Sequence, residues 1–146
     1  MHRYTSKQGI NLIKQFEGFR PKPYVCIGGF QTIGYGHKLL PHEKYPYIDE
    51  TEAELILTAD LNKAERAVLK YINVLLSDNQ FTALVSFTYN VGIAALQRST
   101  LRQKLNYGDY LTAGEEFLKW IYASGRQISG LVIRRKIESA LFLHKI

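Results

Sequence analysis

The chain has 146 residues, of which 46% are hydrophobic and 22% charged, as in an ordinary soluble globular domain. This composition excludes an intrinsically disordered chain, and the sequence contains no low-complexity tract and no repeat of solenoid length. The net charge of +6 favours an anionic partner, which nucleic acid, cell-wall polymer or lipid headgroups would each provide.

The single cysteine and the first residues bear on the expected location. Cys26 has no second cysteine for an internal disulfide, so the fold does not depend on one. The first residues lack the apolar segment of a signal peptide, and no apolar run reaches the roughly 20 residues needed to cross a bilayer. We therefore expect synthesis in a reducing cytoplasm without stable membrane insertion. A substrate outside the cytoplasm would then require delivery by another protein.

Signals for helix starts recur along the chain. A Ser or Thr followed three residues later by Glu or Gln predicts helices that begin near Thr5, Thr51, Ser77 and Thr100. The first helix is expected over about residues 6–16, with Gly18 ending it. Two further helices are predicted over about residues 110–120 and 131–144. The last one is expected to gather its apolar residues on one side: Ile133, Ile137, Ala140 and Leu141.

Residues 18–48 differ in composition and are rich in proline, glycine and aromatic residues. Residues 24–26 and 30–33 predict two short strands joined by a glycine turn. The sequence therefore predicts an α+β fold with a β lobe over about residues 18–48 and a linking helix over about residues 51–76. A helical lobe over about residues 77–146 is expected to include the N-terminal helix. A cleft between two such lobes suits an extended substrate.

Glu17 is the first candidate catalytic residue. It falls at the end of the first predicted helix, where the helix dipole disfavours a negative charge, and Phe16 and Phe19 would add desolvation. Both effects favour the protonated carboxyl that a general acid needs for glycoside cleavage. Taken alone, however, a glutamate at a helix end is more often a solvated surface residue.

The sequence around Glu17 resembles the active-site segment of the phage-type lysozymes, or endolysins, of glycoside hydrolase family 24. That segment has a Glu, an Asp nine positions later and a Thr six positions after that. Here the residues are Glu17, Cys26 and Thr32, with Thr32 opening the string Thr-Ile-Gly-Tyr-Gly-His. Cysteine replaces the usual aspartate, a variant that the family pattern admits. Further similar segments are residues 79–87, 89–92, 99–101, 105–106, 108–110, Trp120, 130–131 and 134–135.

This resemblance implies a two-lobed lysozyme fold. It also implies hydrolysis of the β-1,4 bond between N-acetylmuramic acid and N-acetylglucosamine in bacterial peptidoglycan, for host cell lysis. Glu17 would protonate the leaving oxygen, Thr32 would help to hold the attacking water, and Cys26 would take the place of the residue that activates or positions that water. The family inverts the anomeric carbon, which requires room for a water between the acid and its partner. No cofactor is implied, and the four histidines show no metal-ligand spacing.

Three roles are open to Cys26. A free thiol, unlike an aspartate, is mostly neutral at neutral pH. A nearby cation, either His37 or an arginine, would make it a thiolate base; a neutral thiol would only position the water; and a small buried thiol would be inert. The spacing from Glu17 favours the first two roles. We predict that Cys26→Asp keeps activity and shifts the pH profile toward acid.

Other residues of the matching segments have supporting roles. Tyr35, Gly36 and His37 are candidate substrate-binding residues, although His37 is more simply explained as a structural histidine bonded to a carboxylate. Arg134 and Arg135 are candidate supporting residues. Either one of them pairs with Glu17 across the lobes, or both are solvated charges of the last helix.

Three rival functions fit parts of the sequence. A lytic transglycosylase cleaves the same bond with a single glutamate, but the retained Thr32 favours hydrolysis. An inactive relative that binds cell wall fits the missing aspartate, but the retained Glu17 argues against it. Nucleic-acid binding fits the charge, but the basic residues are scattered along the chain. We expect a monomer, and the resemblance implies storage in the host bacterial cytoplasm until a holin opens the membrane.

Overall fold

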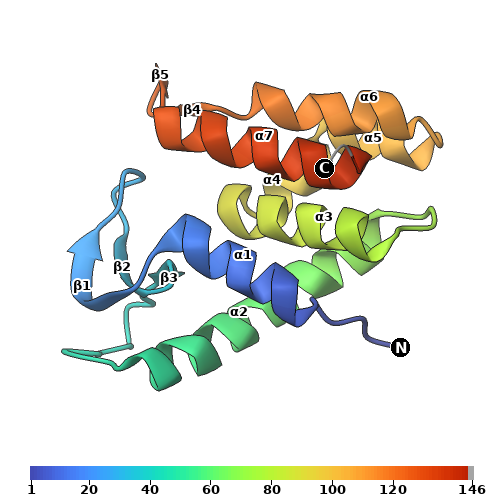
Figure 1. Ribbon diagram of the computed structural model, residues 1–146. Coiled ribbons are helices and arrows are strands. Elements are labelled where there is room, and N and C mark those ends of the chain that lie inside the picture. The colour runs from blue at the N-terminus through green and yellow to red at the C-terminus, as the bar shows by residue number, and fades with distance from the viewer. Residues whose placement is uncertain (145–146) are drawn as a thin grey trace.

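A computed structural model describes residues 1–144 of the chain (Figure 1). Within this range the α-helices are α1 (Lys7–Glu17), α2 (Glu50–Tyr71), α3 (Asp78–Val91), α4 (Ile93–Arg98), α5 (Thr100–Asn106), α6 (Tyr110–Glu116) and α7 (Ser129–Leu143). A 3-10 helix, η1 (Phe117–Lys119), follows α6 directly. The strands are β1 (Arg20–Val25), β2 (Gln31–Gly34), β3 (His37–Lys38), β4 (Tyr122–Ala123) and β5 (Arg126–Gln127). The α+β prediction is therefore confirmed.

The two predicted strands, β1 and β2, join the unpredicted β3 in a three-stranded antiparallel sheet of order β1-β2-β3. Tyr24 pairs with Thr32, and Ile33 pairs with His37. The backbone N–H of Cys26 donates to Phe30 O at 2.9 Å and closes the predicted glycine turn between β1 and β2. The register therefore places Cys26 and Thr32 at the same end of the β1–β2 hairpin.

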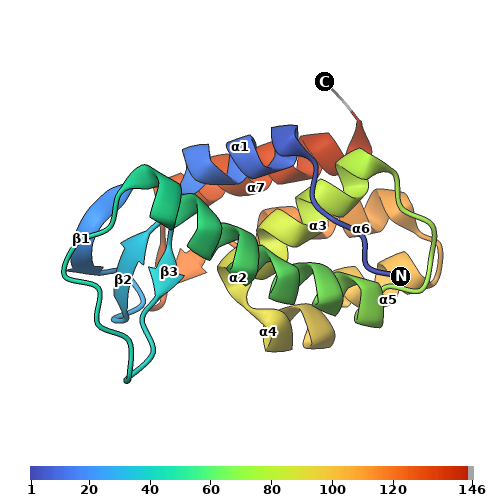
Figure 2. The same ribbon diagram turned by 90° about the horizontal axis from the view of Figure 1, so that it is seen from below.

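Helix α3 is the centre of the helical lobe. Its side chains Phe81, Leu84, Val85 and Phe87 are all buried, and α1, α2 and α7 pack around it. Figure 2 shows α2 running from the β sheet toward α5, so this helix links the two lobes as predicted. It ends at Tyr71, before the predicted end at residue 76, because Ile72 is extended. No helix among residues 1–144 is long and apolar enough to cross a membrane.

Three of the four predicted helix caps are displaced. Ser6, rather than Thr5, caps α1, because the Thr5 hydroxyl donates instead to Glu65 Oε2 at 2.6 Å. Asp49 caps α2 in place of Thr51, and Ser99 caps α5 in place of Thr100. The Ser77 cap of α3 is confirmed. In each corrected case a second capping residue lies one or two positions away, downstream for Ser6 and upstream for Asp49 and Ser99, and local sequence does not decide between the two.

The expected apolar side of the last helix is wrong. Ile133 and Ile137 are 60% and 38% exposed, whereas the buried face of α7 carries Arg134, Arg135 and Glu138. These charged side chains are buried because they bond one another and groups on α1 and α3, which offsets their desolvation. The predicted helix over residues 110–120 is also shorter than expected, since it tightens into η1 after Glu116.

Candidate active site

A cleft of about 720 Å³ lies between the β lobe and the helical lobe. One wall comes from β1, the β1–β2 turn and β3; the other comes from α3, the β4–β5 hairpin and the start of α7. Glu17, Cys26, Thr32 and Gly36 all line it, so the structure brings together the predicted catalytic residues. Other lining residues are Arg20, Tyr24, Lys38, Tyr89, Asn90, Trp120, Tyr122 and Leu131.

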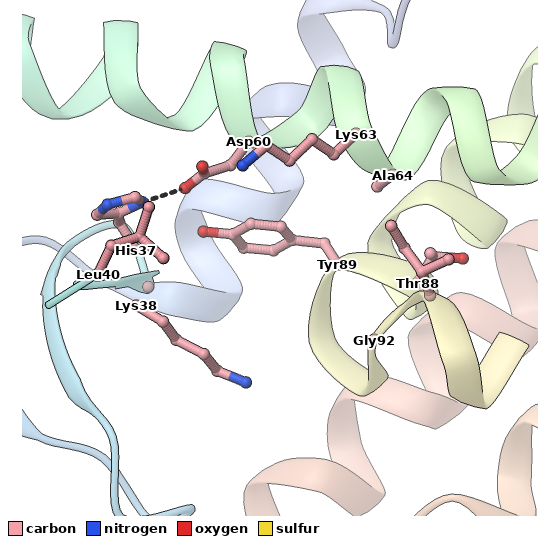
Figure 3. Close-up of a pocket in the computed structure, with 11 residues that line it drawn as sticks. His37, Lys38, Leu40, Asp60, Lys63, Ala64, Thr88, Tyr89 and Gly92 are labelled. Carbon is pink, nitrogen blue, oxygen red and sulfur yellow. Dashed lines mark hydrogen bonds and ion pairs between the residues drawn. The ribbon is translucent and has the colours of Figure 1, made fainter.

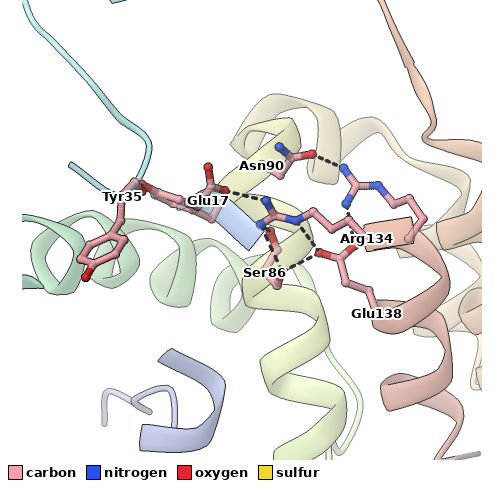
Figure 4. A network of polar contacts seen from close by, with 8 residues as sticks. Glu17, Tyr35, Ser86, Asn90, Arg134 and Glu138 are labelled. Atoms are coloured by element: carbon pink, nitrogen blue, oxygen red, sulfur yellow. Dashed lines mark hydrogen bonds and ion pairs between the residues drawn. The ribbon is translucent and has the colours of Figure 1, made fainter. Parts of the chain in front are cut away.

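Glu17 is the last residue of α1, where Gly18 ends the helix with φ +70°. Arg134 Nη1 donates to Glu17 Oε2 at 2.6 Å across the lobe boundary (Figure 4). The other carboxyl oxygen faces Gly36: a Cβ placed there would lie only 2.5 Å from Oε1. Gly36 also has φ +84°, a conformation that residues with a side chain rarely adopt. The carboxyl is therefore held between an arginine and a position that requires glycine.

Arg134 connects α7 to both α1 and α3. Its Nε donates to Glu138 Oε2 at 3.2 Å, and Nη2 donates to Ser86 O at 3.0 Å, so each nitrogen has an acceptor. Burial on its own would lower the pKa of this guanidinium, but the carboxylates of Glu17 and Glu138 outweigh burial and raise the pKa. Arg134 is therefore a permanent charge beside Glu17. Of the two arginines that the sequence offered as partners of Glu17, Arg134 is the one that forms the pair.

Arg135 points to other partners. Its Nη1 donates to Glu138 Oε1 at 2.6 Å, its Nε donates to Trp120 O at 2.9 Å, and Nη2 bonds the Asn90 side chain. Burial lowers the pKa of Arg135, although the Glu138 carboxylate opposes this effect. Glu138 is fully buried and is shared by both arginines.

Cys26 is half-buried in the cleft. Burial raises the pKa of its thiol. Four opposing effects outweigh burial and leave the pKa below its ordinary value: hydrogen bonds with Thr32, with the backbone at Phe30 and with the backbone at Gly28, and the charge of Lys38. The cation near this thiol is therefore Lys38 rather than His37. The Thr32 side chain is itself buried, and its hydroxyl donates to Phe30 O at 3.0 Å.

His37 joins the β lobe to α2. Its Nδ1 lies 2.6 Å from Asp60 Oδ2 and its Nε2 lies 3.0 Å from Glu43 Oε1, so it has the carboxylate partner expected of a structural histidine. The hydrogen bond to Asp60 raises the pKa of His37; burial lowers it, and the bond to Glu43 raises it further, so the net direction is upward. Figure 3 shows His37 in a second pocket of about 310 Å³, which shares Gly36, Lys38 and Tyr89 with the cleft.

Tyr35 lies differently from the other two candidate substrate-binding residues. Its side chain is only 6% exposed, and its hydroxyl is 3.4 Å from Glu50 Oε2, on the side of α2 rather than in the cleft. Its carbonyl accepts a hydrogen bond from the Tyr89 hydroxyl at 2.7 Å. An expected substrate contact by the Tyr35 ring therefore does not fit the structure, whereas Gly36 lines the cleft.

Sequence reasoning missed several residues of the site. Glu138 follows Arg134 by four positions and Arg135 by three, a spacing that puts an acid on the same helix face as both arginines. That spacing was a usable signal for Glu138. Ser86 and Tyr89 lie within the similar segments 79–87 and 89–92, but nothing in the sequence gave either of them a contact in the site. Lys38 lies outside every similar segment, because it reaches the site through the pairing of strands.

Comparisons with known proteins agree with this geometry. The family described as "Phage lysozyme" matches residues 14–138. The endolysin of Bacillus phage B103 is 46% identical over 140 residues, which are 94% of this chain but only 53% of that protein, so the chain spans about half the length of this relative. The endolysin of Acyrthosiphon pisum secondary endosymbiont phage 1 is 39% identical over 145 residues, covering 95% of this chain and 97% of that protein.

A solved structure extends the likeness to the whole fold. The endolysin from Escherichia coli O157:H7 phage FAHEc1 superposes with a TM-score of 0.87 at 35% identity, over 100% of this chain and 97% of that one. The match therefore includes both lobes and the cleft between them. By its sequence, its fold and the residues of its cleft, this chain belongs to the phage lysozyme family.

Proposed function

We propose that this chain is an endolysin muramidase that hydrolyses the β-1,4 bond between N-acetylmuramic acid and N-acetylglucosamine in bacterial peptidoglycan, for host cell lysis. The observation that carries the proposal is the Glu17 carboxyl, which Arg134 holds in the interlobe cleft that Cys26 and Thr32 also line. Similarity over nearly full length to a phage endolysin supports the same reaction.

In this proposal Glu17 acts as the general acid. Arg134 occupies Oε2, which leaves Oε1 to give its proton to the glycosidic oxygen as the bond breaks. A water held by Thr32 attacks the anomeric carbon from the opposite face of the sugar, so the product is inverted. A cleft of about 720 Å³ has room for a sugar and this water.

Cys26 acts as the base that receives the proton of the attacking water. The lowered pKa of its thiol increases the share of thiolate, and the nearby Lys38 stabilises that charge. Transfer of one proton from water to sulfur and of one proton from Glu17 to the leaving oxygen balances the reaction. Cys26→Ser tests this role, because serine keeps a hydrogen-bonding group but does not ionise, and we expect it to lose most of the activity.

The charge of the cleft suits an acidic glycan. Arg20 and Lys38 are exposed at its β wall, and peptidoglycan carries carboxylates on its peptide stems. The pocket that adjoins the cleft at Gly36, Lys38 and Tyr89 extends the same surface and supports binding of several successive sugars. We propose Gly36 as a substrate contact through its backbone.

The decisive experiment is digestion of purified peptidoglycan, with the released sugar ends identified by mass spectrometry. Glu17→Gln is compared with Glu115→Gln, which makes the same change at an exposed position on α6. Reducing N-acetylmuramic acid ends that vanish only in Glu17→Gln support the proposal. Anhydro ends would make the protein a lytic transglycosylase, and wall binding without release would make it an inactive cell-wall-binding relative.

Delivery to the wall is part of the same proposal. We propose that the chain is a monomer stored in the host bacterial cytoplasm, and that it reaches peptidoglycan after a holin opens the membrane. The test is expression in a bacterial host with and without a holin. Lysis only in the presence of the holin supports this route, and prompt lysis without it would reject it.

A further inference from the structure

The buried polar network behind Glu17 contains an acid for which the proposed reaction gives no role. Glu138 has no exposed surface, and its two oxygens have separate partners. Oε1 accepts from Arg135 Nη1 at 2.6 Å, while Oε2 accepts from the Ser86 hydroxyl at 2.5 Å and from Arg134 Nε at 3.2 Å. Figure 4 shows Arg134 between this carboxylate and that of Glu17.

We propose that Glu138 is a positioning residue that balances the charge of the two buried arginines and so allows Glu17 to hold the proton it donates. This inference rests on the proposed role of Glu17 as general acid. Glu138 does not touch the cleft; it acts through Arg134, which contacts both carboxyls.

The charges of the cluster give the reason. Arg134 and Arg135 contribute two positive charges, and ionised Glu17 and Glu138 contribute two negative charges, so the four cancel. When Glu17 takes up its proton, the cluster carries one positive charge. Without Glu138 it would carry two, and an excess of buried positive charge favours release of that proton. Glu138 therefore opposes ionisation of Glu17 while its bond to Arg134 Nε keeps that guanidinium aimed at Glu17.

Other charged or titratable groups line the same cleft as Glu17, and substitution of Glu138 or Arg135 leaves them in place. They come from β1, the β1–β2 turn, β3 and α3, and they are Arg20, Tyr24, Cys26, Lys38 and Tyr89. Because none of them bonds Glu138 in the described part of the chain, substitution of Glu138 changes the field at Glu17 without removing their contacts.

The experiment follows the Glu17 carboxyl directly. The side-chain carboxyl carbons of glutamate are labelled with ¹³C in the full chain, the Glu17 signal is assigned by its loss in Glu17→Gln, and its titration midpoint is measured. We expect Glu138→Gln to lower the midpoint by about one pH unit and Arg135→Gln to raise it, because the two variants change the cluster charge in opposite directions. Glu115→Gln, at an exposed position on α6, is the control and should leave the midpoint unchanged.

Opposite shifts of the Glu17 titration midpoint in the two variants distinguish a charge effect from damage to the fold. If one variant does not fold, the direction of the shift in the other still tests the inference. A midpoint that stays in place in both variants, or that moves in the same direction in both, would overturn the inference. Activity gives an independent arm: above the midpoint, Glu138→Gln should lower the peptidoglycan rate about tenfold, in line with the smaller protonated fraction. If Glu17→Gln kept full muramidase activity, the proposed function would fail whatever the titration showed.

Discussion

Replacement of Gly36 by alanine tests how narrowly the site positions Glu17. A Cβ at this residue would lie 2.5 Å from Glu17 Oε1 and 3.0 Å from Cδ. Ordinary contact begins near 3.4 Å, so the carboxyl must move by about 1 Å. A displacement of about this size lowers the rate of a positioned reaction by roughly 100-fold. We therefore expect Gly36→Ala to lower kcat by about two orders of magnitude.

The same substitution also strains the backbone, and this effect needs a control. Gly36 has φ +84°, where a residue with a Cβ costs about 1–2 kcal/mol of folding stability. Gly108, between α5 and α6, has φ +85°, and a Cβ there would meet no atom within 4 Å. Gly108→Ala should therefore have a comparable cost in stability with no loss of activity.

The assay pairs thermal unfolding with initial rates of peptidoglycan clearing for both variants. Similar melting temperatures combined with a loss of kcat only in Gly36→Ala would attribute the loss to the contact with Glu17. Equal activity of the two variants, with both correctly folded, would refute the reasoning, because Glu17 would then tolerate a shift of about 1 Å.

Substitutions at three other positions have defined outcomes. Folding raises the pKa of His37, so its stabilising contribution is fully present below the ordinary value of about 6.5 and is lost as pH rises through the folded value. The difference in unfolding free energy between wild type and His37→Asn should therefore shrink from pH 6 to pH 9. A constant difference would contradict this. Cys26→Asp should stay active with its pH–rate profile moved toward acid, whereas Cys26→Ala at full rate would remove Cys26 from the mechanism. Glu65→Gln should lower the free energy of unfolding in urea by about 2–3 kcal/mol, because the buried Glu65 accepts hydrogen bonds from the Thr5 backbone N–H at 2.7 Å and from the Thr5 hydroxyl at 2.6 Å. A loss below about 0.5 kcal/mol would show that these bonds contribute little.

The sequence was sufficient for the long helices, for the β1–β2 hairpin and for three residues of the cleft. Capping residues and glycine turns are local signals, and they placed every long helix and the β1–β2 hairpin to within a few residues. Glu17, Cys26 and Thr32 were found together because one short segment carries all three and the matching spacing extends along the chain. Local signals of this kind can be read from the sequence without knowledge of tertiary packing.

The parts that could not be predicted depend on which surfaces meet. The helical pattern of α7 favoured Ile133 and Ile137 as its buried face, but Arg134 and Glu138 are buried instead. Only the presence of Glu17 and Ser86 opposite them makes that burial favourable, and these partners lie at least 48 positions away in the sequence. In the same way, strand pairing that brings Lys38 beside Thr32 explains why the cation near Cys26 is a lysine that no motif marked.

The acid and the water-holding residues of the proposed reaction belong to different lobes, so the gap between them depends on contacts that join the lobes. Glu17 is bonded to the helical lobe by Arg134, while Cys26 and Thr32 belong to the β1–β2 hairpin of the sheet. The sheet is in turn held by His37 at Asp60 on α2 and by the Tyr35 carbonyl at Tyr89 on α3. Both of these contacts flank Gly36, the residue against Glu17 Oε1. A change at either contact should therefore alter kcat through the width of the gap, even though neither His37 nor Tyr35 takes part in the chemistry.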